Sequence, residues 1–200
     1  MRESHAKRLA LGPLPEAALR DLVRARYRLA AWDEARLVAY LARRTEGNAF
    51  FATELLRALE EQGAVNAGGA RLDALEAIAV PPLLRQVIDA RVMRLGEEAE
   101  GLLEIAAVIG QGVPLDTWAA VAQVDEGTIE LVAERAFAAG LSTETGGEAG
   151  VGFAHALIRE ALYEGIPPIR RRRLHRQVAA ALAAVREPAP DAVAYHFQRA

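Results

Sequence analysis

Up to Gly63, hydrophobic residues recur at intervals of three and four positions, which is the spacing of one face of an α-helix. The pattern predicts three helices: one over Leu14–Ala30, one capped by Asp33 and interrupted at Gly47, and one from Asn48 to Gly63. Asp and Asn accept hydrogen bonds from the first backbone N–H groups of a helix, and Gly commonly ends one. Residues 64–75 contain an asparagine and two glycines, which predicts a loop or weak hairpin. We therefore expect a helical domain over residues 1–75.

A second domain is expected over residues 76–166. Hydrophobic spacing predicts four helices there, at 84–95, 97–109, 116–122 and 125–139. After Gly140 the pattern changes, because 141–144 and 151–153 read as strands around a glycine-rich turn. Three helices followed by a hairpin is the order of a winged helix-turn-helix.

Two further helices are predicted over 167–200, one opening at Pro167-Pro168 and one over Asp191–Arg199. A helix pair cannot bury its apolar side alone, so the segment is typical of the first unit of a helical array. The fold class is therefore mainly α, with one small β-hairpin.

The composition of the chain argues against several classes of protein. The chain carries 24 basic and 27 acidic residues, a net charge of −3, which is not the basic footprint of a nucleic-acid-binding protein. With no cysteine, the chain has no disulfide or thiolate metal site, and a cytoplasmic location is expected. The apolar runs are far shorter than the roughly 20 residues that cross a bilayer, so no membrane partner is expected.

Catalysis by this chain alone is not expected. The only lysine, Lys7, stands between Ala6 and Arg8, whereas a P-loop needs lysine directly after its glycine-rich loop. The four histidines form no HExxH motif and no i, i+4 pair, so no metal ligands and no catalytic residues are assigned.

Charge also argues against DNA recognition. The predicted helix 125–139, which would enter the groove, carries four carboxylates and one arginine. Phosphate neutralisation by basic side chains supplies most non-specific DNA affinity, so no direct DNA contact is expected. The basic cluster Arg170–Arg173 with Arg176 has two interpretations: a solvated helix face, or contact with an acidic partner or a nucleotide phosphate.

Two short motifs have both a structural and a functional interpretation. Thr45–Phe51 is either an ordinary helix–helix turn with Phe50 and Phe51 in the core, or a binding turn. His155 stands where the second hairpin strand passes into a helix, and a helix N-terminus favours an anion. A lone histidine is more often structural.

Together, the stretches TEGNAFFATELLRALEEQG, VPPLLRQVIDARVMRLGEEAEGLLEIAAVIG and FAHALIREALYEGIPPIRRRRLHRQVAAAL resemble the STAND-class, AAA+-like signalling ATPases of bacteria, as in large LuxR-type transcriptional regulators. The resemblance runs from about Leu9 to the end of the chain. It implies a segment that follows the family's P-loop and Mg²⁺-binding strand: a helical lid, a winged helix and the start of a tetratricopeptide-like (TPR) region.

The resemblance also implies nucleotide-binding residues for a full-length protein. The family's lid turn, glycine–any residue–proline, packs by the adenine; Gly47, Asn48 and Ala49 match it, with Ala49 replacing the proline. The family's winged helix has a histidine that reaches the β-phosphate of ADP, and His155 matches that position. ATP or ADP with Mg²⁺ is thus expected in the full-length protein, with none bound tightly by this chain.

The function expected is regulatory: the chain holds the closed, ADP-bound state of a signal-transduction ATPase. Its expected partners are an N-terminal P-loop domain and C-terminal helical repeats of the same protein, with self-association on activation. The alternatives are a non-catalytic helical scaffold for protein interaction and, disfavoured by charge, a DNA-binding winged helix.

Overall fold

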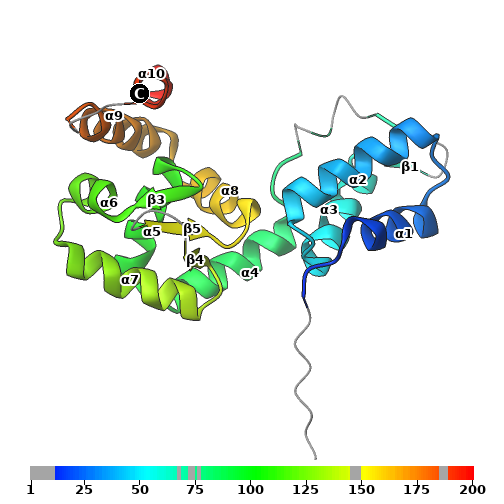
Figure 1. Ribbon diagram of the computed structural model, residues 1–200, viewed down its shortest axis with the longest axis horizontal. Coiled ribbons are helices and arrows are strands. Elements are labelled where there is room, and N and C mark those ends of the chain that lie inside the picture. Colours follow the sequence, from blue (N-terminus) through cyan, green and yellow to red (C-terminus); the bar gives the residue numbers. More distant parts are fainter. Residues whose placement is uncertain (1–11, 67–68, 72–74, 76–77, 145–149, 185–188) are drawn as a thin grey trace, which may run out of the picture. The chain divides into compact units, whose positions relative to one another are not determined.

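The computed structural model describes residues 12–66, 69–71, 75, 78–144, 150–184 and 189–200. This part of the chain is mainly helical, with ten helices and a small three-stranded sheet (Figure 1). Lys7 and most of the glycine-rich turn, residues 145–149, lie outside it. The chain divides into two compact units, Met1–Ile78 and Ala79–Ala200, so the further division at residue 166 stays a prediction.

Unit 1 is a three-helix unit with a short hairpin. Its elements are α1 (Glu16–Arg26), α2 (Ala31–Thr45), α3 (Ala49–Glu61), β1 (Val65–Asn66) and β2 (Gly69–Ala70). One apolar side of each helix meets the others in a single core, which includes Leu19, Val23, Leu37, Leu41, Leu55 and Leu59. Of the two predicted alternatives for residues 64–75, a loop or a weak hairpin, the structure has the hairpin.

Two local predictions in unit 1 are wrong, and one interpretation, with Phe50 and Phe51 both in the core, is right for Phe51 only. Helix α1 ends at Arg26, since Tyr27 turns extended, buries its ring and donates a hydrogen bond from its hydroxyl to Glu60 at 2.5 Å. Asp33 lies inside the first turn of α2, whose N-cap is Ala30. Phe50 is 41% exposed and only Phe51 enters the core.

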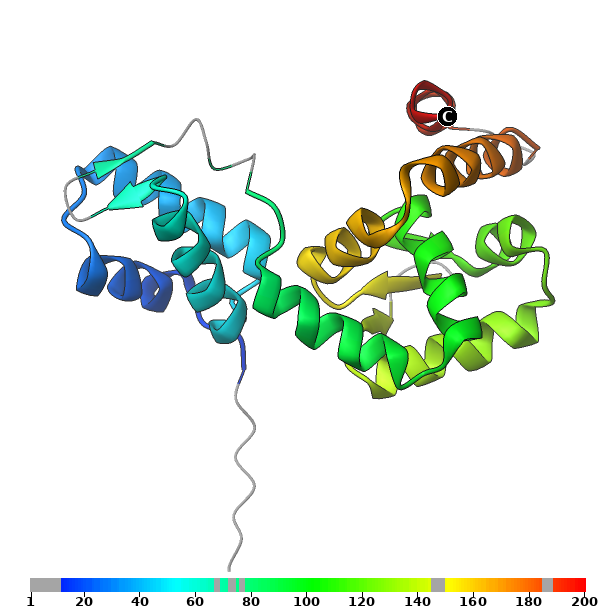
Figure 2. The same cartoon turned by 180° about the vertical axis from the view of Figure 1, so that it is seen from behind.

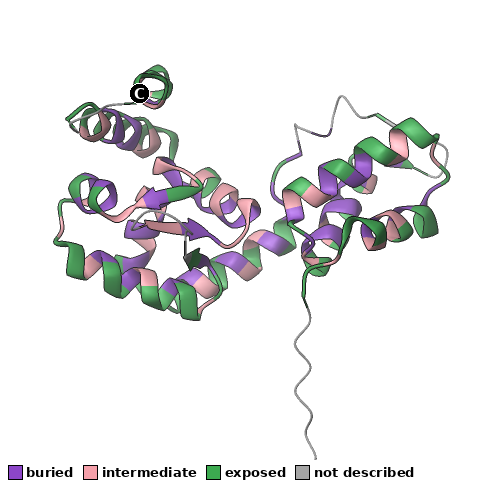
Figure 3. Ribbon diagram, viewed as in Figure 1, coloured by how far each residue is buried: buried purple, intermediate pink, exposed green. Residues whose placement is uncertain are grey.

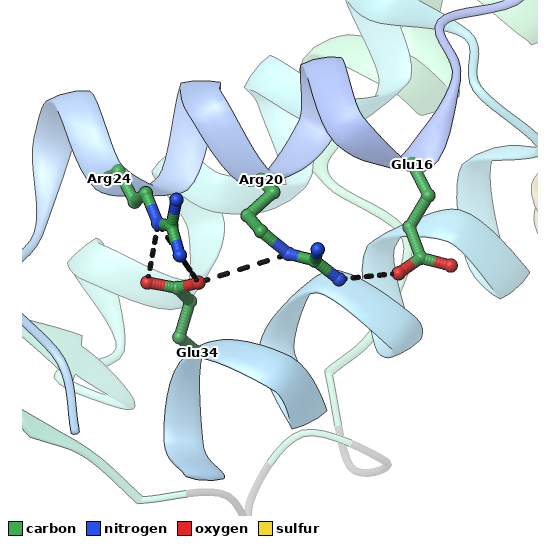
Figure 4. Close-up of polar contacts among 4 residues, drawn as sticks. All are labelled: Glu16, Arg20, Arg24 and Glu34. Carbon is green, nitrogen blue, oxygen red and sulfur yellow. Dashed lines mark hydrogen bonds and ion pairs between the residues drawn. The ribbon is translucent and has the colours of Figure 1, made fainter. Parts of the chain in front are cut away.

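Ion pairs link α1 to α2 (Figure 4). Arg24 donates from Nε to both carboxylate oxygens of Glu34, at 3.0 and 2.9 Å, and Arg20 Nε lies 3.8 Å from Glu34 Oε1. Within α1, Arg20 also bonds Glu16 at 2.7 Å. The hydrogen bond from Arg24 lowers the pKa of Glu34. Since surface ion pairs contribute little stability, the packing of α1 on α2 depends mainly on their shared apolar core.

Unit 2 holds the three-stranded sheet and seven helices of the described chain. In order they are α4 (Pro82–Met93), α5 (Glu97–Ile109), β3 (Gly112–Pro114), α6 (Leu115–Ala122), α7 (Glu126–Ala138), β4 (Ser142–Glu144), β5 (Gly150–Phe153), α8 (Ala156–Gly165), α9 (Pro168–Ala184) and α10 (Pro190–Arg199). The sheet is antiparallel with order β3-β5-β4. Helix α5 packs against α4, α6, α7, α8, α9 and β3, and so forms the centre of the unit (Figures 1 and 2).

Most elements of unit 2 follow from local signals. The Asp125 side chain accepts from the Thr128 N–H at 3.0 Å and caps α7, as predicted. Gly140, with φ +67°, ends the same helix. Strand β3 was not predicted, since it has three residues and ends in proline; it exists because β5 pairs with it, Val113 facing Val151.

Burial follows one side of each helix (Figure 3). The largest side chain in the core of unit 2 is Trp118 on α6, which is 1% exposed and donates from Nε1 to the Leu102 carbonyl at 2.9 Å. No helix in the described ranges is long and apolar enough to span a membrane.

Candidate functional site

Three of the predicted nucleotide-binding residues, Gly47, Asn48 and Ala49, lie at the turn between α2 and α3. Glu46 (φ 49°) and Gly47 (φ 78°) both adopt left-handed backbone, which reverses the chain within two residues. Asn48 then caps α3, its side chain accepting from the Phe51 N–H at 3.2 Å. The sequence therefore predicted this turn and its cap correctly.

Gly47 is required by a close backbone approach. The Leu14 N–H donates to the Gly47 carbonyl at 2.8 Å, so the segment before α1 crosses directly over the turn. A Cβ atom at Gly47 would lie 2.5 Å from the Leu14 carbonyl oxygen and 2.9 Å from Pro13 Cβ. This close packing is sufficient to explain why residue 47 is a glycine, and no bound ligand is needed for the explanation.

Ala49 is exposed at the first position of α3, followed by the partly exposed Phe50 ring. Proline is favoured at the first position of a helix because the N–H of that position has no partner within the helix, so nothing is lost when it is absent. Ala49 keeps the same helical start with a smaller apolar side chain. The exposed residues at this turn are thus Glu46, Ala49 and Phe50.

His155 is the N-cap residue of α8, with extended backbone (φ −149°, ψ 144°) and a half-buried side chain. Its position is fixed from both sides. Before it, Ala154 donates to the Leu141 carbonyl at 3.0 Å; after it, Arg159 Nε bonds the Ala107 carbonyl of α5 at 3.0 Å. The ring therefore lies at the positive end of an anchored helix.

The α2–α3 turn belongs to unit 1 and His155 to unit 2. Each of these two candidate sites is held in place by hydrogen bonds within its own unit.

A second cluster, which the sequence did not predict, lies where α8, α9 and α10 meet α5. His175 and His196 are 1% and 3% exposed, and their Nδ1 atoms are 2.9 Å apart. The Nε2 atom of His175 lies 2.9 Å from the Tyr163 hydroxyl, and His196 also hydrogen-bonds the backbone of Ile109. We call these four residues the histidine network. Their spacing in sequence gave no signal, since α9 and α10 bring them together only in the folded chain.

One arrangement of protons satisfies every member of the histidine network. Tyr163 donates to Nε2 of His175, Nδ1–H of His175 donates to Nδ1 of His196, and His196 donates to the Ile109 carbonyl. Both rings are then neutral. Two protonated rings would bring two Nδ1–H groups face to face.

The surroundings of the histidine network also oppose protonation. Burial, then the neighbouring His196 and the cations Arg199, Arg171 and Arg159, lower the pKa of His175 to about 4. Burial is likewise the main cause of the lowered pKa of His196. The network therefore stays neutral under ordinary conditions.

Acidification from pH 6.5 towards pH 4 should destabilise unit 2 through these histidines. The pKa values of both histidines are lower in the folded state, so the unfolded chain takes up protons first as the pH falls. The stabilisation that the neutral histidines give to the folded state is therefore complete above pH 6.5 and is lost as the pH falls to about 4. For His175 we expect a loss on the order of 2 kcal/mol.

Urea unfolding between about pH 5 and pH 6.5 measures this loss away from most carboxylate titrations. His175→Gln removes one titrating ring and should flatten the pH dependence. An equal slope in wild type and variant would contradict the assignment.

The arginine cluster divides in two. Arg170 bonds Glu104 of α5 at 2.7 Å, and Arg171 lies over the Tyr163 ring at 4.9 Å. Arg172, Arg173 and Arg176 are exposed on the outer side of α9. The cluster is therefore part structural and part open surface.

Within the described residues, no group of three or more metal-binding side chains is present. No protein-family model matches the chain, and no curated protein matches it.

Proposed function

We propose that this chain is a regulatory segment of a nucleotide-switched signalling ATPase. In this proposal unit 1 is a helical lid, and unit 2 combines a winged helix with the first TPR-like pair, α9 and α10. The support is the order of elements in unit 2, where α5, α6 and α7 are followed by the β4–β5 hairpin and joined by a third strand, β3.

The observation that carries the proposal is the position of His155. It is a half-buried imidazole at the N-terminus of α8, directly after β5. A helix N-terminus favours negative charge, and an imidazole can donate a hydrogen bond to a phosphate. In the full-length protein, ADP would bridge the P-loop domain, the turn at Gly47 and His155, and would hold the closed state. Exchange for ATP and binding of an inducer would open it.

His155→Ala in the full-length protein should weaken ADP binding by about 1–2 kcal/mol, the contribution of one charge-assisted hydrogen bond. Signalling without inducer should rise, because the closed state loses a contact that the open state lacks. Calorimetry with Mg-ADP measures the affinity. Thermal unfolding of the 200-residue chain is the control: a large fall in its melting temperature with unchanged ADP affinity would make His155 structural.

The 200-residue chain by itself should bind Mg-ATP and Mg-ADP only weakly and should not hydrolyse ATP. One histidine and one turn cannot replace the backbone N–H groups and lysine that cradle phosphates in a P-loop. Calorimetry on the isolated chain tests this expectation, and sub-micromolar binding would contradict it.

The competing function is a helical scaffold for protein interaction, without nucleotide. The two are distinguished by the coding sequence upstream of this chain. A strand followed by GxxxxGK[ST] is required by the ATPase proposal, and its absence would leave the scaffold.

A further inference from the structure

The outer side of α9 is a continuous cationic stripe. Ile169, Arg172, Arg173 and Arg176 follow the spacing i, i+3, i+4, i+7, so they share one helix face. All four are exposed, and Ile169 is the most exposed large hydrophobic residue described, at 85%. The opposite side of the helix packs into the unit through Leu174, His175, Val178 and Ala179. We call the exposed set the α9 stripe.

The α9 stripe is unfavourable for an isolated unit. The first turn of α9 holds no acidic residue, and cations near a helix N-terminus oppose the helix dipole. Arg172 and Arg176, four residues apart, also repel each other. Neither they nor Arg173 forms an ion pair with any residue the structure describes, whereas Arg170 is paired with Glu104. Such an uncompensated face is typical of a surface that meets a partner.

The composition of the stripe favours a protein partner over a nucleic acid. An exposed isoleucine beside arginines matches the apolar-and-arginine make-up of protein interfaces, and it gains nothing from phosphate. The chain is also acidic overall, at −3. The partner should therefore offer carboxylates next to an apolar side chain.

The exposed side of α7 has this chemistry. Glu126, Glu130 and Glu134 are exposed at successive i+4 positions, and Leu131 beside them is 56% exposed. The single arginine of α7, Arg135, donates to the Leu95 carbonyl within its own unit. We call Glu126, Glu130, Leu131 and Glu134 the α7 face.

One copy cannot join these two surfaces. Helices α7 and α9 lie at opposite ends of unit 2, with α6 and the sheet between them, in both views (Figures 1 and 2). We propose that unit 2 associates head to tail, the α9 stripe of one copy docking on the α7 face of a second copy. The three arginines then meet the three glutamates, and Ile169 packs against Leu131. Because the two surfaces differ, a pair of copies keeps one α9 stripe and one α7 face open, and the contact can propagate. It needs no nucleotide and goes beyond the function proposed above.

Sedimentation of the 200-residue chain at about 50 mM salt, where exposed charges are screened least, should show a mass that rises with protein concentration. At about 0.5 M salt the association should fall sharply. Arg172→Ala/Arg173→Ala and Glu130→Ala/Glu134→Ala should each weaken self-association about tenfold or more. Circular dichroism checks that both variants are folded. The matched control is Arg28→Ala/Arg36→Ala, which removes two exposed arginines of unit 1 and should associate like wild type.

Mixing the two unit 2 variants gives the decisive result. One retains only the α7 face and the other only the α9 stripe, so an equimolar mixture should form dimers that grow no further. A wild-type chain that stays monomeric at low salt, or a mixture that does not associate, would overturn the proposal. Arginine variants that lose association while the glutamate variants keep it would place the partner surface elsewhere and also overturn it.

Discussion

Trp118→Ala should lower the stability of unit 2 by about 3–5 kcal/mol, the usual cost of deleting a fully buried tryptophan. The indole is 1% exposed and its N–H bonds the Leu102 carbonyl of α5, the central helix of the unit. The substitution therefore removes apolar contacts and a buried hydrogen bond together. Denaturant unfolding followed by far-UV circular dichroism measures the loss.

The chain supplies its own control for this experiment, because its second tryptophan is on the surface. Trp32 on α2 is 72% exposed, so Trp32→Ala should change stability by no more than about 0.5 kcal/mol. Since the two units have separate cores, the transition that shifts with Trp118→Ala should be that of unit 2. Similar losses for the two variants would contradict the burial assigned to Trp118.

Gly47→Ala should destabilise unit 1 by about 2–4 kcal/mol, combining left-handed backbone strain with overpacking. The added Cβ would meet backbone atoms of Leu14 at 2.5 and 2.9 Å, and backbone cannot move aside as a flexible side chain can. Thermal unfolding of unit 1 measures the change.

Gly63→Ala separates the two contributions to this effect. Gly63 has a similar φ, +66°, but a Cβ atom added there would meet no atom within 4 Å, so only strain of about 1 kcal/mol is expected. The difference in stability loss between the two variants measures the steric cost of placing a Cβ atom against the segment before α1. Equal losses of stability would mean that the segment before α1 can move away from the added Cβ atom with no energetic penalty.

Local chemistry explains which parts of the fold could be predicted from the sequence. The caps at Asn48 and Asp125 and the stop at Gly140 depend on neighbouring residues alone, and all three are confirmed. Strand β3 depends on its pairing with β5, which lies far along the chain, so no local pattern indicated it. Helix α1 ends early for a similar reason, because the Tyr27 hydroxyl bonds Glu60 of α3.

The candidate sites show the same division. His155 was expected at a strand-to-helix junction, and it is the N-cap of α8. The contact between His175 and His196 could not be predicted, since it depends on how α10 docks on α9. The sequence allows two interpretations of the arginine cluster, and the structure divides the cluster between internal contacts and exposed surface.

Helix α10 is attached in an unusual way, since the one fully buried residue among Pro190–Arg199 is the polar His196. The heat-capacity change of a docking step is set mainly by the apolar area it removes from water. Detachment of α10 should therefore carry only a small heat-capacity increment, and its free energy should vary almost linearly with temperature. Burial-driven packing weakens on cooling, whereas a contact whose one buried residue is a hydrogen-bonded histidine should depend less on temperature. On cooling, the docking of α10 on α9 should therefore weaken proportionally less than the apolar packing of either core.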